Sequence, residues 1–350
     1  MKSNINFTFV RHGFGCHNAI SGLMKSDIIS VQDALSFSGK NKSIIKPMID
    51  PVLTQIGVDA SIHNGCVMSK IIKSIDKILK SSYDLNENDN SMKIDSIHVI
   101  GCSPLIRCME TAYYMTRSWA NPPSKIYVFP FLREIDESSN NKFSYQSKMI
   151  MESKPFYAMK SIEEQKKYLE RLGILNFFDF SFVEIFKKER KEPGDISNFI
   201  KWFVTFFLKE KYLSETLNIF IVTHAGVLSD FVNNEEGFIN NSGFIINTEY
   251  NTEYNTEYNI LYKDTNNIQD TNSIVIKKYV SLNSFLQYFN FYQDYKSTNQ
   301  KEYYCPSNRC EELCNIAKGE SNISEIKHIE TKCDINEVVD LPSLLKILNL

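Results

Sequence analysis

Short apolar runs alternate with amphipathic stretches along the first two thirds of the chain. Three mostly apolar runs, at 7–10, 97–100 and 219–222, each pass directly into a turn that contains glycine. Runs of this length bounded by turn residues are typical of buried strands. Helix-compatible stretches follow the second and third runs, at 105–117 and 226–232. This alternation predicts an α/β fold with a mostly parallel central sheet.

Charged and imidazole side chains follow these three strands. Arg11, His12 and Gly13 come directly after the first strand, Arg107 lies a few residues beyond the second, and His224 follows the third. The carboxyl ends of parallel strands meet at one edge of the sheet, where open α/β folds bind their ligands. We therefore expect two histidines and two arginines to share this edge.

Other stretches complete the predicted organisation. Helical spacing of apolar residues predicts further helices at 62–79, 161–171, 180–191 and 195–208. The polar stretch 81–91 reads as a surface loop. The tetrapeptide Asn-Thr-Glu-Tyr occurs three times from Asn247 to Tyr258, which is too short a unit for a solenoid and predicts an expanded loop or an extruded hairpin.

Composition narrows the range of partners. The 350-residue chain has a formal net charge of −3 and a pI near 6.1, so it has no general attraction to nucleic acid or to anionic lipid. It contains no apolar run of the roughly 20 residues that a membrane span requires, and its first residues lack the apolar core of a secretory signal. We expect a cytoplasmic protein that binds neither nucleic acid nor membrane.

The cysteines are expected to be reduced. Cys16, Cys66, Cys102 and Cys108 are scattered among apolar or motif positions, and no secretory signal precedes them. A zinc site could be drawn from the tail, but its spacings lack a Cys-x-x-Cys pair and match zinc sites poorly; the residues are Cys305, Cys310, Cys314, His328 and Cys333. The apolar-periodic stretch 341–350 is expected to dock on its own domain.

Five sequence pieces together resemble the histidine phosphatase superfamily, branch 1, which has the phosphoglycerate mutase-like fold. They occur in the order typical of that family, each motif strand lies in front of its motif, and they span residues 5 to 235, about two thirds of the chain. The pieces are Arg11-His12-Gly13 with Asn18, Leu53-Thr54 with Gly57, Ser103-Pro104-Leu105 with Arg107 and Thr111-Ala112, Leu132-Arg133-Glu134, and Thr223-His224-Ala225-Gly226.

The resemblance implies a three-layer α/β/α sandwich with a mostly parallel central sheet. The catalytic domain would cover residues 1–295, with insertions at about 81–91, 140–192 and 245–275, and residues 296–350 would form a C-terminal extension. In the family, the interval corresponding to 140–192 sits over the catalytic pocket and varies with the substrate.

The residue types at the expected sheet edge suit phosphoryl transfer. A phosphoryl group in transfer spreads negative charge over three oxygens and needs several fixed donors. Arg11, Asn18, Arg107 and His224 could supply them, and the planar fork of arginine can bind two phosphate oxygens at once. The substrate is therefore expected to carry a phosphate.

His12 is the expected nucleophile, because a neutral imidazole is nucleophilic near neutral pH without a separate base. The resemblance implies a phosphohistidine at this residue. Expulsion of an alkoxide leaving group requires a proton donor, and Glu134 is the preferred candidate because it follows Leu132-Arg133 as in the family pattern. Asp136 and Glu137 lie close enough in sequence to be rivals.

No metal or other cofactor is expected. Cys16 and His17 lie beside His12, but no carboxylate or second histidine occurs there at ligand spacing. Thr111 and Ala112 are expected to be packing residues, and Glu110 is expected to be a helix-surface carboxylate.

Departures from the family favour hydrolysis over mutase activity. Phe14 stands where mutases of this family commonly carry Glu, Gly15 replaces a common Ser, and the basic substrate-binding stretch of mutases is missing between Glu134 and Glu192. The sequence thus predicts a metal-independent phosphomonoester hydrolase. The alternatives are a phosphoglycerate mutase-type phosphotransferase and a non-catalytic phosphate-binding protein. The substrate remains open among sugar phosphates, nucleotides, inositol phosphates and phosphoproteins, and the oligomeric state is open too.

Overall fold

The computed structural model describes residues 2–18, 49–73, 97–117, 119, 124–135, 159–208, 216–233, 238–251, 259–262 and 273–282. Within these ranges a sheet of eight strands runs in the order β4-β3-β2-β5-β1-β6-β8-β7. The strands are β1 (Lys2–Arg11), β2 (Val99–Cys102), β3 (Ile126–Val128), β4 (Phe178–Asp179), β5 (Leu217–Thr223), β6 (Gly243–Asn251), β7 (Asn259–Tyr262) and β8 (Ser273–Ser281).

The sheet is mostly parallel, as the alternation of strands and helices predicts. β1 pairs in parallel with β5, β5 with β2, β2 with β3, and β3 with β4. β6 runs antiparallel to β1 and to β8. The three motif strands are therefore parallel neighbours in the order β2-β5-β1, and their carboxyl ends lie at one edge.

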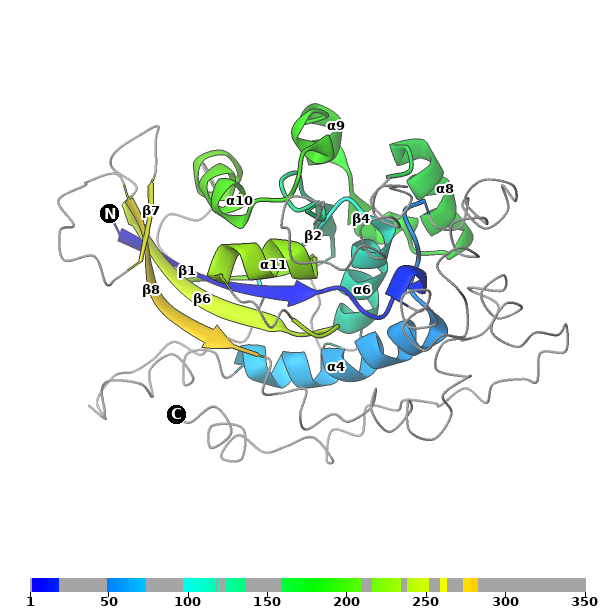
Figure 1. The fold of residues 1–350 in the computed structure, drawn as a ribbon, viewed down its shortest axis with the longest axis horizontal. Helices are drawn as coiled ribbons and strands as arrows, with labels where there is room; N and C mark the ends of the chain where they lie inside the picture. Colours follow the sequence, from blue (N-terminus) through cyan, green and yellow to red (C-terminus); the bar gives the residue numbers. More distant parts are fainter. Residues whose placement is uncertain are drawn as a thin grey trace, which may run out of the picture.

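Alternating side chains of the central strands build a core on each face of the sheet. In β1, Phe7 and Phe9 belong to one buried cluster and Val10 to the other. Helices α4 (Gln55–Lys73), α6 (Ile106–Thr116) and α8 (Ile162–Arg171) contribute to the Val10 cluster. Helices α10 (Ile196–Trp202) and α11 (Ala225–Val232) contribute to the Phe7 cluster, so helices pack on both faces (Figure 1).

Most of the predicted helices are confirmed. α6, α8 and α11 fall inside or within one residue of the predicted stretches, and the Ser161 side chain caps α8 together with Glu164. α4 begins at Gln55, earlier than predicted, because the Thr54 side chain accepts a hydrogen bond from the Gly57 amide and starts the helix there. Residues 74–79 of the predicted helix lie outside the described residues.

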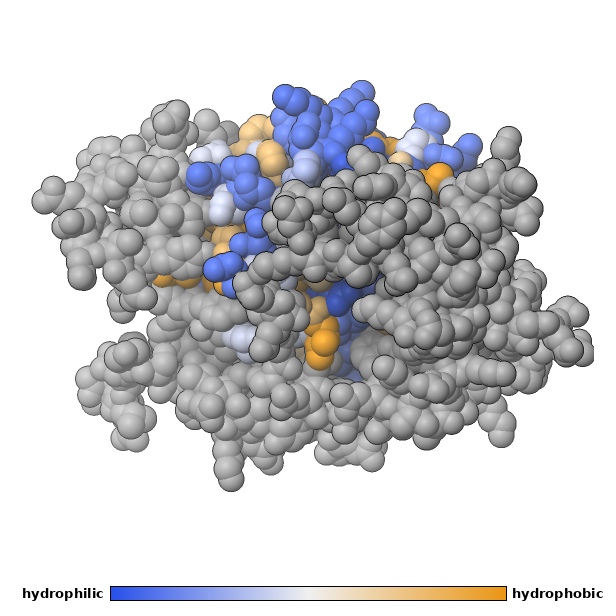
Figure 2. All heavy atoms as spheres, viewed as in Figure 1, coloured by the Kyte–Doolittle hydropathy of each residue, from blue (hydrophilic) through white to orange (hydrophobic). Residues whose placement is uncertain are grey.

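Two predicted elements are different in the structure. The second strand is displaced to Val99–Cys102, because Gly101 and Cys102 pair with β5 instead of forming the turn. Gly101 also lies under the ring of Phe129, where a Cβ would come within 2.3 Å of ring atoms. The helix expected over 180–191 is only the short α9 (Ser181–Ile185), followed by a 3-10 turn at Glu189–Lys191 that directs Arg190 into the interior. Hydrophilic residues gather on the surface around α9 (Figure 2).

The helix expected over 195–208 continues in a different form. α10 (Ile196–Trp202) passes directly into a π-helical segment at Phe203–Phe207. None of the helices in the described part of the chain combines the length and the apolar character that a membrane crossing demands.

The cysteine and repeat predictions have mixed outcomes. Cys102 and Cys108 are free and buried, whereas Cys16 and Cys66 are disulfide-bonded, so the expectation of reduced thiols is wrong for these two. The first copy of the tetrapeptide repeat, Asn247–Tyr250, is part of strand β6. Residues 252–258, the polar stretch 81–91 and the tail from 283 onward, with its cysteines, lie outside the described residues.

Candidate active site

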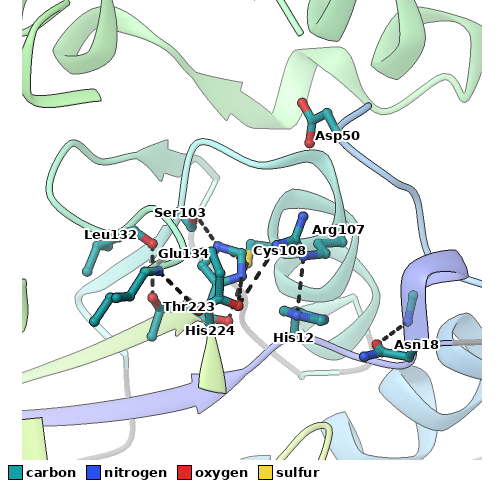
Figure 3. A network of polar contacts seen from close by, with 12 residues as sticks. His12, Asn18, Asp50, Ser103, Arg107, Cys108, Leu132, Glu134, Thr223 and His224 are labelled. Atoms are coloured by element: carbon teal, nitrogen blue, oxygen red, sulfur yellow. Dashed lines mark hydrogen bonds and ion pairs between the residues drawn. The ribbon is translucent and has the colours of Figure 1, made fainter. Parts of the chain in front are cut away.

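The carboxyl ends of β1, β5 and β2 bring three predicted site residues together (Figure 3). His12 follows β1, His224 follows β5, and Arg107 lies in the first turn of α6, just after β2. The two imidazole rings are 5.2 Å apart between centroids. All three side chains are almost completely buried. Helices α6 and α11 also begin at this edge, so the positive ends of their dipoles lie there.

The tautomer of His12 follows from its hydrogen bonds. Its Nδ1 lies 2.7 Å from the carbonyl oxygen of Gly13, which can only accept, so Nδ1 carries the proton. Its Nε2 accepts a hydrogen bond of 3.2 Å from Nε of Arg107. The Nε2 lone pair is therefore directed toward a fixed guanidinium group.

His12 is neutral at physiological pH. Burial of the ring is the largest cause that lowers its pKa well below 6.5, and the charge of Arg107 is the second. His224, His17 and Arg11 lower it further. Neutral imidazole is the form that can attack an electrophile, and this environment preserves that form below the ordinary pKa of histidine.

The loop that carries His12 is held from three directions. The Gly13 amide donates to Oγ1 of Thr111 over 2.8 Å. Nδ2 of Asn240 donates to the carbonyl oxygens of His12 and Gly13, at 2.9 and 3.1 Å. Gly13 packs so closely against α4 that a Cβ would lie 2.6 Å from Oγ of Ser61. Packing therefore requires glycine at position 13.

Arg107 has unused hydrogen-bonding capacity. Only 1% of the residue is exposed, and Nη2 lies 4.0 Å from Oε2 of Glu134. Its Nη1 is buried and has no hydrogen-bond partner among the described residues. An unsatisfied buried donor of a charged group costs free energy, so this position favours an anionic ligand whose oxygen could accept from Nη1.

His224 is held by different partners. Its Nε2 lies 2.7 Å from Oγ of Ser103, and its Nδ1 lies 3.4 Å from Oε2 of Glu134. The Sγ of Cys108 lies 3.4 Å from Nε2. Burial is the largest cause that lowers the pKa of His224 well below 6.5, and Arg107 is the second. The ring is therefore neutral, and one of its two nitrogens carries a proton.

Glu134 faces the guanidinium of Arg107 and the imidazole of His224. The residue is 8% exposed, and its carboxyl oxygens face His224 and Arg107. Gly226, in the first turn of α11, makes room for it, since a Cβ there would lie 2.8 Å from Oε1. The rivals Asp136 and Glu137 lie outside the described residues.

Arg11 and Asn18 line the same loop. Arg11 is partly buried, and its Nη1 donates to the carbonyl of Phe238 over 2.5 Å. Its charge contributes to the lowered pKa of both His12 and His224. Oδ1 of Asn18 accepts from the Gly15 amide over 2.9 Å, so this amide side chain braces the loop and leaves its Nδ2 to donate elsewhere.

His17 adds a third imidazole to the site. Its ring centroid lies 5.3 Å from that of His12. Burial is the largest cause of its lowered pKa, followed by Arg107 and Arg11. Its ring covers Gly15, where a Cβ would lie 2.7 Å from Nδ1 of His17. A side chain at position 15 would therefore have to displace the ring of His17.

His12, Glu134 and His224 could also be read as metal ligands. One ligand atom from each lies within 4.8 Å of the others. However, a metal at Nε2 of His12 would compete with the hydrogen bond from Arg107 and would bring a second positive charge beside a buried guanidinium. The donor set therefore suits an anion better than a cation.

Several residues of the site were not predicted. Thr111, expected to be only a packing residue, links the Gly13 amide to the backbone carbonyl of Arg107. Glu110, expected on the helix surface, is fully buried and accepts from the Leu53 amide and from the Tyr168 hydroxyl. Ser103 stood in a motif without an assigned role, and Asn240 gave no signal in the sequence.

Comparison of the sequence with models of known protein families finds no match, and comparison with curated proteins finds none either.

Proposed function

We propose that this chain is a metal-independent phosphomonoester hydrolase with a phosphoglycerate mutase-like fold, which works through a phosphohistidine on His12. The observation that carries the proposal is Arg107. It directs Nε at the nucleophilic nitrogen of His12 and has a buried Nη1 without a hydrogen-bond partner among the described residues. A phosphate oxygen bound by that nitrogen would bring phosphorus close to Nε2 of His12.

In the first step, the Nε–H of Arg107 turns from Nε2 of His12 to a phosphate oxygen. The freed Nε2 lone pair attacks phosphorus as the bond between phosphorus and the ester oxygen breaks. Arg107, Arg11 and Asn18 donate to the three equatorial oxygens, on which charge develops, and the Nε2–H of His224 turns from Ser103 to join them. Glu134 donates its proton to the departing alkoxide. The products of this step are the free alcohol, a Glu134 carboxylate and phosphorylated His12.

In the second step, water attacks phosphorus opposite Nε2. The Glu134 carboxylate takes a proton from the water, the bond between nitrogen and phosphorus breaks, and phosphate leaves. Nδ1 keeps its proton throughout, since the Gly13 carbonyl accepts it. The active site thus returns to its starting protonation state after each turnover.

Glu134 is suited to this exchange by its contact with His224. Two hydrogen-bond patterns satisfy the pair: a protonated Glu134 can donate to Nδ1 of His224, or Nδ1 can donate to a Glu134 carboxylate. In the first pattern Nε2 of His224 donates to Ser103, and in the second it accepts from Ser103. The same geometry therefore accommodates the acid and the base forms of Glu134.

A panel of phosphomonoesters tests the proposal. It should include a sugar phosphate, a nucleotide, an inositol phosphate and a phosphopeptide, with His12→Ala as the control. We expect release of inorganic phosphate from at least one class by the wild type and none by the control. Transfer of phosphate to another position of the substrate, without release, would instead establish a phosphotransferase. Absence of both reactions, with retained phosphate binding, would support a binding protein.

A further inference from the structure

Asp50 is a buried carboxyl group outside the site described above. None of the residue is exposed to solvent, and its backbone adopts a left-handed conformation with φ of 53°. Its Oδ1 accepts a 2.7 Å hydrogen bond from the amide of Ile106. Its Oδ2 accepts from Nε2 of Gln165 at 2.6 Å. A buried carboxyl group in a rarely adopted conformation requires support from such contacts.

Asp50 caps the helix that carries Arg107. The first turn of a helix has backbone amides without partners inside the helix. In α6 the preceding residue, Leu105, has no side chain that could accept from them. Asp50 takes this place at the amide of Ile106, from 56 residues earlier in the chain. Figure 3 shows Arg107 between Asp50 and His12 in this view.

Further hydrogen bonds fix Asp50 itself. Nε2 of Gln165 donates to the Pro104 carbonyl, directly before α6, as well as to Asp50. Oε1 of Gln165 accepts from Arg190, which also donates to the Lys160 carbonyl. Nζ of Lys160 donates to the backbone carbonyl of Asp50. Lys160 and Gln165 thus hold Asp50, and Gln165 also holds Pro104, which precedes α6.

We propose that Asp50, held by Gln165, is a positioning residue that fixes the first turn of α6 and so keeps Nε of Arg107 on Nε2 of His12. The inference rests on the proposed function for its biological meaning. The position of the Arg107 charge relative to His12 can be tested whether or not the protein hydrolyses phosphomonoesters.

The pKa of His12 depends on the distance between Nε of Arg107 and Nε2 of His12. The charge of Arg107 is a main cause that lowers this pKa, so withdrawal of Arg107 should raise it. The other charged or titratable groups that face His12 are Arg11 and His17 on its own loop, His224 after β5, and Glu134. Lys160, Arg190 and Arg107 face Asp50.

The sign of the change separates positioning from a direct charge effect. Removal of a negative charge at Asp50 would by itself destabilise a protonated His12 and lower its pKa. Loss of Arg107 from its place has the opposite sign. A general loss of stability changes the folded fraction but leaves the pKa of His12 in the folded protein unchanged.

The test is a titration of His12 by NMR in the full chain labelled with ¹⁵N-histidine, with His12→Gln used for assignment. Arg107→Gln calibrates the effect and should raise the pKa of His12 by about one pH unit. We expect Asp50→Ala to raise it by roughly half that amount. Asp50→Asn keeps an oxygen for the Ile106 amide and should cause a smaller rise than Asp50→Ala. Asp195→Ala, which removes the cap of α10 on the other face, should cause none.

An unchanged or lowered pKa in folded Asp50→Ala, beside a raised one in Arg107→Gln, would overturn the proposal. An equal rise of the His12 pKa in Asp50→Asn and Asp50→Ala would show that Asp50 does not position Arg107 through its hydrogen bond to the Ile106 amide. If Asp50→Ala does not fold, Gln165→Met decides by the same criterion: a rise supports the proposal, and its absence overturns it. Turnover is not measured, so a failure of the proposed function leaves this result readable.

Discussion

The ends of β1 and β5 are alike in backbone and different in chemistry. The two strands pair in parallel from Ile5 opposite Leu217 to Arg11 opposite Thr223, and each is followed by a buried histidine. Yet His12 meets a backbone carbonyl and a guanidinium, whereas His224 meets a hydroxyl and a carboxyl group. Equivalent positions in a sheet thus acquire different hydrogen-bond partners from the residues around them.

For His12 these partners leave one nitrogen with a directed lone pair, which is what a nucleophile requires. For His224 the single N–H faces Ser103 or Glu134, and we expect it to turn to a phosphate oxygen when substrate binds. The following experiments are designed to separate these two roles.

Replacement of His12 should have the largest effect. We expect His12→Ala to reduce phosphate release by about 10⁴-fold or more, because the nucleophile is lost. Phosphate affinity should be partly retained, since Arg107, Arg11 and His224 remain, and calorimetry with inorganic phosphate measures it. In the wild type, labelled substrate should leave an acid-labile, base-stable adduct on His12. Label on another residue, or turnover without any adduct, would contradict the proposed nucleophile.

Replacement of Glu134 should reduce the rate most for substrates whose leaving group requires protonation. Glu134→Gln should slow hydrolysis of an alkyl phosphate by ~10²–10⁴-fold, as is typical of general-acid loss. Hydrolysis of p-nitrophenyl phosphate should suffer less, because the phenolate departs without much help. Equal losses on both substrates would mean that Glu134 only shapes the pocket. The same contrast in Asp136→Asn or Glu137→Gln would move the acid to that residue.

Replacement of His224 should slow the reaction without removing the intermediate. We expect His224→Gln to reduce kcat by about 10²–10³-fold, as for loss of one donor to developing negative charge. The labelled adduct should still form on His12 and should be detected by rapid quenching. Loss of the adduct in this variant, with normal phosphate binding, would contradict the division of roles between the two histidines.

The gathering of these residues was predictable from the sequence for a simple reason. Each strand is a short apolar run, its charged residues follow at once, and parallel strands end at the same edge. Parallel pairing of β1, β5 and β2 is therefore sufficient to bring together His12, Arg107 and His224. The position of the turn after the second strand was predicted less well, because Gly101 and Cys102 pair with β5 and belong to β2.

The supporting residues could not be predicted, because their partners are distant in sequence. Asp50 binds an amide 56 residues away, and Thr111 binds the Gly13 amide from 98 residues away. Glu110 has the spacing of a solvent-facing helix residue, but Leu53 and Tyr168 cover it. Helical periodicity describes one element at a time and carries no information about what packs over it.

The two histidines should contribute alike to the pH dependence of the free energy of unfolding. Both have lowered pKa values in the folded protein, with burial as the largest cause. Below pH 6.5 the unfolded chain therefore binds protons that the folded protein does not, so the free energy of unfolding falls as pH falls. At one pH unit below the unfolded pKa, each imidazole that stays neutral should contribute a loss of about 1.4 kcal/mol.

Urea unfolding near neutral pH and one to two units lower measures this loss. His12→Gln and His224→Gln should each reduce the pH dependence, by similar amounts. An unchanged pH dependence in either variant would mean that the imidazole concerned is not held neutral in the folded protein.

Removal of metal should have the smallest effect, and it tests whether the two histidines act separately or as one ligand set. His12, Glu134 and His224 are close enough to bind one ion, and in that case the two imidazoles would have the same role. The hydrogen bond from Arg107 to Nε2 of His12 opposes this, because a cation would have to displace a buried guanidinium from the lone pair. We therefore expect phosphate release to survive dialysis against EDTA, and added Zn²⁺ to give no increase. Loss of activity with EDTA and its recovery with Zn²⁺ or Mg²⁺ would replace the phosphohistidine mechanism with metal-assisted hydrolysis, even if every residue of the site were correctly identified.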